Sequence, residues 1–250
     1  MTPPTRRLVV TVALAGTAAF VVWGLTGLPP FGGYRGPYGF RVNAVAVGET
    51  HATGIVSAVN FFYRGFDTVG EEYILFIAAT GVATVLRRLR GEDEKETDPQ
   101  EPDVPPTSEA VRMFTLALLG FVFVMGWFLA SHAQTSPAGG FQGGVVSVTA
   151  VLMIYLAGQY LRMRRLSPID LLDAVEAAGA GGFAAVGIGA LATGAAYLAD
   201  VLPLGNHLGA VNSSGTIVLI SLLVGVEVTA AFLVIVSELL EQTLLVGGER

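Results

Sequence analysis

The stretch Ser214–Leu240 reads SGTIVLISLLVGVEVTAAFLVIVSELL, and its length and hydrophobicity decide the fold class. Roughly 20 predominantly apolar residues suffice for an α-helix to cross the hydrocarbon core of a bilayer. Glu227 stands near the middle, so the sequence predicts a carboxylate near the membrane midplane. A charge there costs about 2.5 to 3.5 kcal/mol or more, so such residues usually have a function. Glu227 either handles an ion or proton or, protonated or hydrogen-bonded, only holds helices together.

The rest of the chain has the same character. Of its 250 residues 52% are hydrophobic and only 14% are charged, whereas soluble domains carry about 25% charged residues. We therefore predict an all-α, polytopic membrane protein with six transmembrane helices. The six apolar blocks are Leu8–Leu28, Tyr73–Leu86 (whose helix can begin upstream, within Phe66–Glu72), Val111–Ala130, Val145–Leu161, Leu171–Ala199 and Thr216–Leu240.

The first block is expected to be a retained span, although Arg6 and Arg7 before it resemble a twin-arginine signal. Secretory signals have an apolar region of about 7 to 15 residues, which is shorter than Leu8–Leu28. The chain has no cysteine, and its three histidines lie in separate segments. We therefore expect no disulfide, no metal site and no cofactor on this chain.

The arginines predict the orientation, because Lys and Arg accumulate in short cytoplasmic loops. With six spans, every arginine cluster beside a span falls on one face, and both termini fall there too. We expect a multi-pass protein of the plasma (inner) membrane with cytoplasmic ends. The arginines that predict this orientation are Arg6, Arg7, Arg87, Arg88, Arg90, Arg112, Arg162, Arg164 and Arg165.

Residues 91–108, GEDEKETDPQEPDVPPTS, form an acidic, proline-rich segment without apolar periodicity. Such a composition is typical of a disordered or extended linker. It divides the chain into a two-span region, residues 1–90, and a four-span region, residues 109–250. The division is either the seam of two fused units or an ordinary loop.

Two motifs could carry chemistry, and the first follows an apolar piece, Ala52–Tyr63, that is too short to cross the membrane. We expect this piece to be a re-entrant or interfacial half-helix. It leads into RGFDTVGE, Arg64–Glu71, in which Asp67 and Glu71 share one helical face. In a poorly solvated place this pair would share a proton or hold a cation, with Arg64 as counter-charge. Alternatively, Asp67 is the N-cap of an ordinary helix, and the acids in its first turn interact favourably with the positive end of the helix dipole.

The second motif, PAGGFQGG, joins the third and fourth blocks. Its glycines predict positive φ angles and close approach of backbones, and its glutamine offers an uncharged hydrogen-bonding group. It lacks the Lys-Ser/Thr of a phosphate loop, and a purely structural turn is the alternative. The motif comprises Pro137, Ala138, Gly139, Gly140, Phe141, Gln142, Gly143 and Gly144.

A further acid, Glu176, is the deepest of three that descend into the fifth block. It either faces a cytoplasmic water funnel or snorkels to the surface. In the same block Gly181, Ala185, Gly189 and Thr193 repeat every four residues, which predicts a helix-packing seam.

Together the two motifs resemble a known family. RGFDTVGE resembles the (F/Y)RGFDTLGE element in the C-terminal part of the A subunit of Mrp-type multisubunit Na+/H+ antiporters, which also occurs in a small subunit of related membrane-bound hydrogenases. PAGGFQGG resembles the PGGGFQGG element of the antiporter's B subunit. Val69 and Ala138 depart from these patterns. The resemblance covers about residues 8–90 and 109–242, and the acidic linker falls where the two subunits would be fused.

The resemblance implies a non-enzymatic transporter subunit that moves Na+ and H+ within a complex of other membrane subunits. Asp67 and Glu71 would be the acidic pair of the ion route, Gln142 and its glycines would shape the cavity, and Glu227 and Glu176 are added from burial alone. The only lysine is Lys95, so the chain cannot supply the buried Lys–Glu relay of a complex I-type pump. The alternatives are an ion-translocating subunit of a membrane-bound hydrogenase or other redox-driven complex, or a subunit that is only structural.

Overall fold

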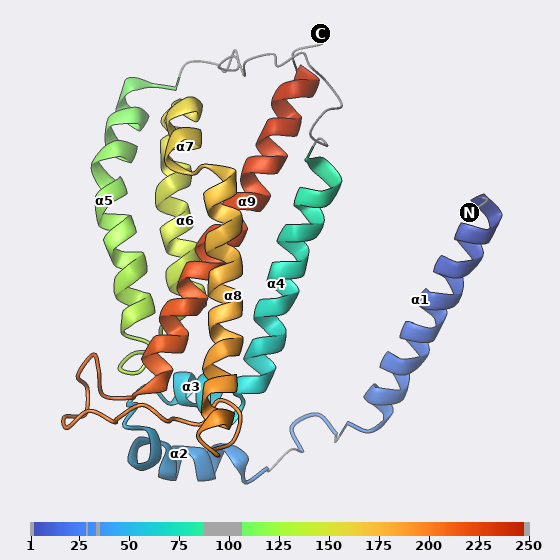
Figure 1. Ribbon diagram of the computed structural model, residues 1–250. Helices are drawn as coiled ribbons and strands as arrows, with labels where there is room; N and C mark the ends of the chain where they lie inside the picture. The colour runs from blue at the N-terminus through green and yellow to red at the C-terminus, as the bar shows by residue number, and fades with distance from the viewer. Residues whose placement is uncertain (1–2, 29, 34–35, 88–106, 248–250) are drawn as a thin grey trace. The chain divides into compact units, whose positions relative to one another are not determined.

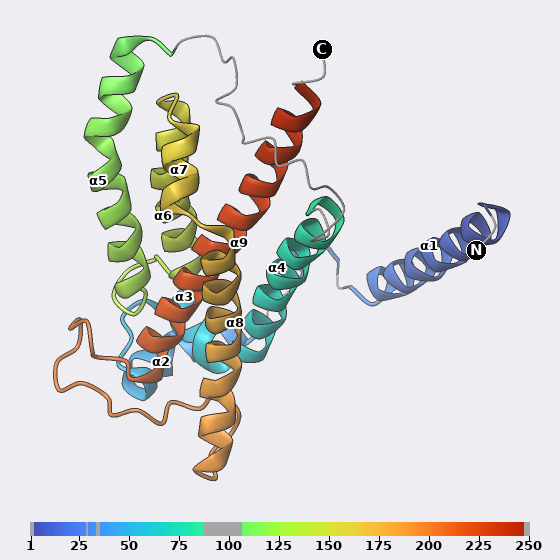
Figure 2. The same cartoon turned by 45° about the horizontal axis from the view of Figure 1, so that its top comes forward.

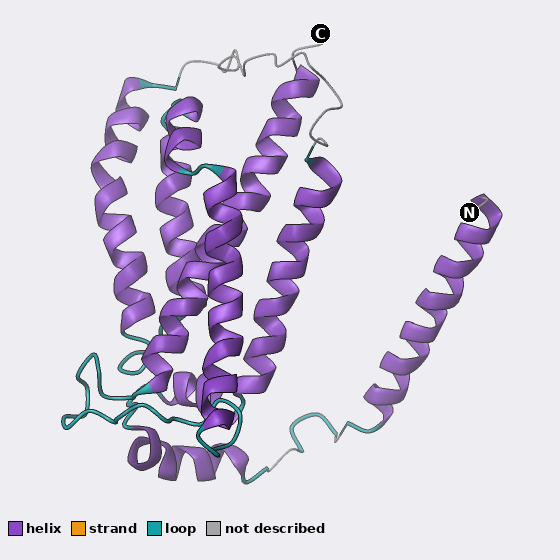
Figure 3. Cartoon of the chain, viewed as in Figure 1, coloured by secondary structure: helices purple, strands orange, loops and turns teal. Residues whose placement is uncertain are grey.

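The computed structural model describes residues 3–28, 30–33, 36–87 and 107–247. Of the predicted linker, only Thr107 and Ser108 fall within these ranges, and Arg88 and Arg90 lie outside them. Every regular element in the described part of the chain is a helix, as Figure 3 shows. The all-α prediction is confirmed.

The chain divides into two compact units, residues 1–41 and 42–250. The first unit contains α1 (Pro3–Thr26), whose part Arg7–Thr26 is long and apolar enough to cross a membrane. Helix α2 (Tyr38–Thr50) begins in the first unit and continues into the second.

The second unit is a bundle of five long helices with shorter ones at its ends (Figure 1). The long helices are α4 (Gly65–Leu86), α5 (Glu109–Ser131), α6 (Gly140–Leu156), α8 (Ile169–Ala192) and α9 (Thr216–Gly247). The short ones are α3 (Ile55–Ala58), the π-helix η1 (Val59–Tyr63) and α7 (Tyr160–Leu166). A groove lies at the end of the bundle that contains η1 and the start of α4, and we call this end the groove end. The opposite end, where α4 is followed by Arg87, is the Arg87 end.

Helix α9 is the centre of the bundle and contacts α4, α5, α6 and α8. It crosses the bundle obliquely in both views (Figures 1 and 2). It can occupy this place because its sequence is apolar around the whole helix, which is the pattern of a buried helix. Its residues Ile217, Ile220 and Val224 form one core cluster with Phe61 and Phe183.

Five helices in the described part of the chain satisfy the length and hydropathy of a membrane span, and α6 is a shorter apolar helix. Each of the six predicted blocks therefore contains a helix. The start of α4 at Gly65 agrees with the expected extension upstream of Tyr73. The fifth block was predicted too long, because α8 ends at Ala192 and a loop follows. The segment expected to be a half-helix contains α3 and η1, and its re-entrant or interfacial placement stays a prediction.

The positive φ angles predicted for the second motif are wrong, and the alternative of a structural turn holds only for its first residues, Pro137–Gly139. Helix α6 begins at Gly140, five residues before the predicted span, so most of the motif is helical. Gly139 has an extended backbone with φ of −179°, and none of the motif's glycines has a positive φ. The backbone approach was predicted correctly. A Cβ on Gly144 would lie 2.7 Å from Val228 Cβ, and a Cβ on Gly143 would lie 2.6 Å from Gly126 O.

The predicted packing seam on α8 does not pack against another helix among the described residues. Gly181 and Gly189 have no atom within 4 Å of a built Cβ. The contacts with α9 are made instead by the neighbouring face of α8, at Gly179 and Gly182.

Candidate functional site

The two sequence motifs meet in one groove, although more than sixty residues of chain lie between them. The groove has a volume of about 270 Å³. The first motif contributes Thr68 and Glu71, Glu72 follows it directly in the wall, and the second motif contributes Pro137–Gln142. Residues of α3 and η1, among them Asn60, complete the wall.

Hydrogen bonds to backbone oxygens hold this wall in place. The Thr68 hydroxyl donates to the Asn60 carbonyl at 2.7 Å and so joins α4 to η1. The Ser57 hydroxyl donates to the carbonyls of Ala133 and Ala138, at 2.6 and 3.2 Å. The half-helix is thereby tied both to the first motif and to the loop that carries the second. Single-turn π-helices are frequent at functional sites.

Asp67 and Glu71 lie on the exposed side of α4. The Arg64 Nε donates to Asp67 Oδ2 at 2.6 Å, and half of the Asp67 side chain is exposed. Asp67 lies in the first turn of α4, but Arg64 and not Asp67 occupies the N-cap position. Of the predicted acidic pair, only Glu71 contributes to the groove.

Glu72, which directly follows Glu71 and the first motif, is the buried acid at this position of α4. Its residue is 3% exposed, and its Oε2 has no hydrogen-bond partner among the described residues. The sequence contained a signal for it. Gly65, Thr68, Glu72 and Ala79 follow a helical period and form the buried face of α4, whereas Glu71 is one residue, or about 100°, away from that face.

Glu227 lies at the contact of α9 with α8. It is 0% exposed, and neither carboxylate oxygen has a hydrogen-bond partner in the described part of the chain. Gly179 makes room for it, because a Cβ at that position would lie 2.7 Å from Glu227 Cβ. Glu227 interacts electrostatically with Glu72 of α4 and Glu176 of α8.

Glu176 is buried inside the bundle rather than turned to the surface of the chain. It is 3% exposed, and its Oε1 has no hydrogen-bond partner among the described residues. Its electrostatic neighbours on the side away from Glu227 are Asp173 and Arg87. We call Glu72, Glu227 and Glu176 the carboxylate row.

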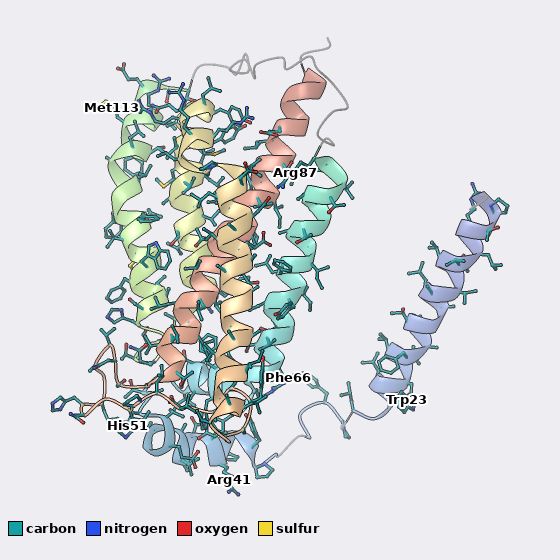
Figure 4. The ribbon with its side chains drawn as sticks, in the orientation of Figure 1. Trp23, Arg41, His51, Phe66, Arg87 and Met113 are labelled. Atoms are coloured by element: carbon teal, nitrogen blue, oxygen red, sulfur yellow. The ribbon has the colours of Figure 1, made fainter. Side chains whose placement is uncertain are left out.

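At the Arg87 end, one guanidinium joins three helices. Arg87 Nη1 and Nη2 donate to the two oxygens of Asp173 at 2.6 and 3.2 Å, and Nε donates to Glu238 Oε1 at 2.7 Å. Glu238 is 2% exposed. The hydrogen bonds from Arg87 to Asp173 are the largest cause that raises the pKa of Arg87 above its usual range. We call Arg87, Asp173 and Glu238 the Arg87 clamp; Figure 4 shows Arg87 at the end of α4.

The row and the clamp together extend along most of the bundle. At 1.5 Å per residue, Glu227 lies about 16 Å along α9 from Thr216, and Glu238 lies about 16 Å further. The row therefore begins at the groove, passes the middle of α9 and ends beside the clamp.

The sequence did not point to Glu72 or Glu238 as site residues. It identified Arg87 only as one of the arginines that predict the membrane orientation. Glu238 lies eleven residues after Glu227, and eleven residues are close to three helical turns. That spacing places both acids on one face of α9 and could have revealed the second acid.

The fold and the site define a class: a polytopic helical membrane protein with acidic side chains enclosed among its spans. A family model described as a domain related to the MnhB subunit of Na+/H+ antiporter matches residues 110–234. That is half of the 250 residues, and the chain belongs to this family. The predicted resemblance is confirmed for the four-span region, and the fusion with an A-subunit segment stays a prediction.

Two solved structures are similar along nearly the whole chain. A chain of the membrane-bound sulfane sulfur reductase (MBS), an archaeal respiratory membrane complex, is 28% identical with a TM-score of 0.68, and the match covers 94% of this chain and 98% of that one. A chain of the Mrp complex from Dietzia sp. DQ12-45-1b is 20% identical with a TM-score of 0.66. This match covers 96% of the present chain but 26% of the other. A search of the curated proteins finds no match.

Proposed function

We propose that the chain is a membrane subunit of a multisubunit Na+/H+ antiporter-type complex and lines a cation/proton pathway within it. The observation that carries the proposal is the connection of the groove, built from both motifs, to the carboxylate row. Acids enclosed in a membrane span are expensive and usually belong to an ion or proton route. Membership of the MnhB-related family supports the same function.

The groove end is the proposed entrance. Asp67, held by Arg64, stands at the exposed start of α4, and Glu71 and Glu72 line the groove with Gln142. Carboxylate, amide and hydroxyl oxygens are the donors that a small hard cation accepts. In this proposal Glu72 passes the proton to Glu227, because its electrostatic neighbours are Glu71 outside and Glu227 inside.

The chain requires partner subunits in this proposal. It contains no lysine in its spans, so the coupling step must come from other membrane subunits. Two of the solved structures similar to it come from complexes, one of them a respiratory membrane complex. In this proposal the chain is not itself an enzyme. The ions transported by the complex are Na+ and H+, and both termini of the chain are cytoplasmic.

A redox-driven complex is the second candidate, and one observation favours it. The match with 28% identity and almost complete coverage of both chains is to a subunit of a respiratory complex, the sulfane sulfur reductase. Purification of the chain in mild detergent separates the candidates: a co-purifying subunit with iron–sulfur clusters indicates a redox-driven complex, and its absence together with Na+-driven proton movement indicates an antiporter.

The pathway itself is tested by neutral substitutions in the assembled complex. In everted membrane vesicles, Glu72→Gln and Glu227→Gln should each reduce Na+-driven proton movement at least about tenfold, since a general acid–base group contributes about 10² or more to proton transfer. Glu109→Gln, at the exposed first turn of α5, is the matched control and should leave it unchanged.

Asp67→Asn and Glu71→Gln test the entrance in the same assay. If all four substitutions leave transport at the level of the control while the complex assembles, no pathway passes through this chain and a structural role remains.

A further inference from the structure

The Arg87 clamp has no role in the pathway proposed above, although it lies directly at the end of the carboxylate row. Its guanidinium makes three hydrogen bonds to two carboxylates, and these come from α8 and α9 while Arg87 ends α4. The side chain of Arg87 is 37% exposed and that of Glu238 is 2% exposed, so the pair lies at the edge of the buried region. The clamp therefore joins the three helices that carry the row.

Glu176 lies one turn beyond Asp173 on α8, on the side of the row. The charged groups that act on Glu176 are Asp173 on its own helix, Arg87 from α4 and Glu227 from α9. Glu238 of α9 acts on Arg87. Arg87 is the one positive charge in this set, and the other members are all acids.

Resting on the proposed function, we propose that Arg87 is the positioning residue at the end of the carboxylate row. Its guanidinium, divided between Asp173 and Glu238, sets how readily Glu176 releases a proton at that end. A positive charge within about 4 to 6 Å of a carboxyl group stabilises the ionised form. The bidentate contact with Asp173 fixes the guanidinium in place, because the planar fork of Arg matches the two carboxylate oxygens.

Removing a positive neighbour of Glu176 in one variant and a negative neighbour in another distinguishes this role from a structural one. In everted vesicles that contain the whole complex, Arg87→Gln should move the pH of half-maximal transport upward by about one unit, because Glu176 loses its positive neighbour. Asp173→Asn should move it downward, because a negative neighbour is removed and the guanidinium is freed. Arg87→Lys keeps the charge and should restore the wild-type pH profile.

Arg164→Gln is the matched control. Arg164 pairs with Glu241 at the same end at 3.4 Å, outside the row, so its loss should leave the profile in place. A purely structural clamp predicts equal loss of assembled complex for Arg87→Gln and Asp173→Asn with unshifted profiles, and that result would overturn the inference. Wild-type transport by Glu176→Gln would also overturn the inference, since no proton would then depend on Glu176; the proposed function fails only if Glu72→Gln and Glu227→Gln leave transport unchanged as well.

Discussion

At the scale of single residues, the site depends on where a Cβ atom is missing. Glu227 fits between α8 and α9 because Gly179 faces it, and α6 approaches α9 because Gly140 and Gly144 face Ser221 and Val228. A helical glycine costs about 1 kcal/mol relative to alanine. The close helix packing that these glycines permit offsets this cost and places the second motif at the wall of the groove.

The first prediction concerns Gly140. A Cβ here would lie 2.7 Å from Val224 Cβ and 2.8 Å from the backbone nitrogen of Gly225, and still closer to Ser221 O. Gly140→Ala should therefore lower stability by about 1 to 3 kcal/mol, the usual cost of overpacking. Thermal unfolding in detergent measures the effect. Gly181→Ala, where a built Cβ meets nothing within 4 Å, is the control and should unfold no earlier than wild type.

The second prediction concerns Asp200, in the loop before α9. Its Oδ1 accepts a hydrogen bond of 2.7 Å from the Thr216 backbone nitrogen and so caps α9. Burial raises the pKa of Asp200 above its ordinary value, although the bond from Thr216 opposes the shift. A raised pKa in the folded state means that the fold binds the proton more tightly than the unfolded chain.

Stability from Asp200 is therefore fully present below the unfolded pKa and is lost as pH rises through the raised folded pKa. We expect the melting temperature of wild type, relative to Asp200→Asn, to rise as pH falls from about 7 to 4, because this range lies above the unperturbed pKa of Asp, about 3.9. A constant difference over this range would contradict the assignment. Asp200→Ala removes the cap and should cost about 1 kcal/mol.

At the scale of elements, hydrophobicity predicted which segments are helices, and local geometry decided where they begin and end. The apolar blocks give the bounds of α5 within two residues and the start of α9, whereas α9 continues seven residues beyond the predicted Leu240. The second motif was expected as a turn because glycine favours turns. It is helical instead because Gly140, Gly143 and Gly144 allow two neighbouring helices to approach, and that tertiary stabilisation is invisible in one segment alone.

The third prediction concerns the contact between the half-helix and the loop of the second motif. The Gly54 nitrogen donates to the Gln134 carbonyl at 2.8 Å, and a Cβ on Gly54 would lie 2.6 Å from Ala133 O. Gly54→Ala should lower the free energy of unfolding by about 1 kcal/mol or more. Gly48→Ala in α2, where nothing lies within 4 Å, is the control. Equal melting temperatures for the two variants would show that this contact is not required.

At the scale of the whole molecule, pattern and composition predicted the membrane class and the family, but only part of the site. Glu227 and Glu176 could be chosen from depth alone. The burial of Glu72 and the pairing of Arg87 with Asp173 and Glu238 depend on which faces of α4, α8 and α9 meet. One sequence does not fix those contacts between distant segments.

The fourth prediction concerns orientation and uses the absence of native cysteine. The arginine clusters predict that the Arg87 end of the bundle is cytoplasmic. A membrane-impermeant maleimide should then label Asn206→Cys, in the loop before α9, from outside intact cells. It should label Leu166→Cys, at the end of α7, only in inverted vesicles. The reverse pattern would invert the proposed topology.

The tie between the half-helix and the loop of the second motif has one more consequence. Ser57 and Gly54 form hydrogen bonds with backbone atoms of Ala133, Gln134 and Ala138, and α4 lies against α8 and α9. We therefore expect the portions before residue 88 and after residue 106 to associate without a covalent link. A gene split anywhere between codons 88 and 106 should yield two polypeptides that reassociate when co-expressed. A lineage could therefore have joined or separated these portions without redesigning the surface between them.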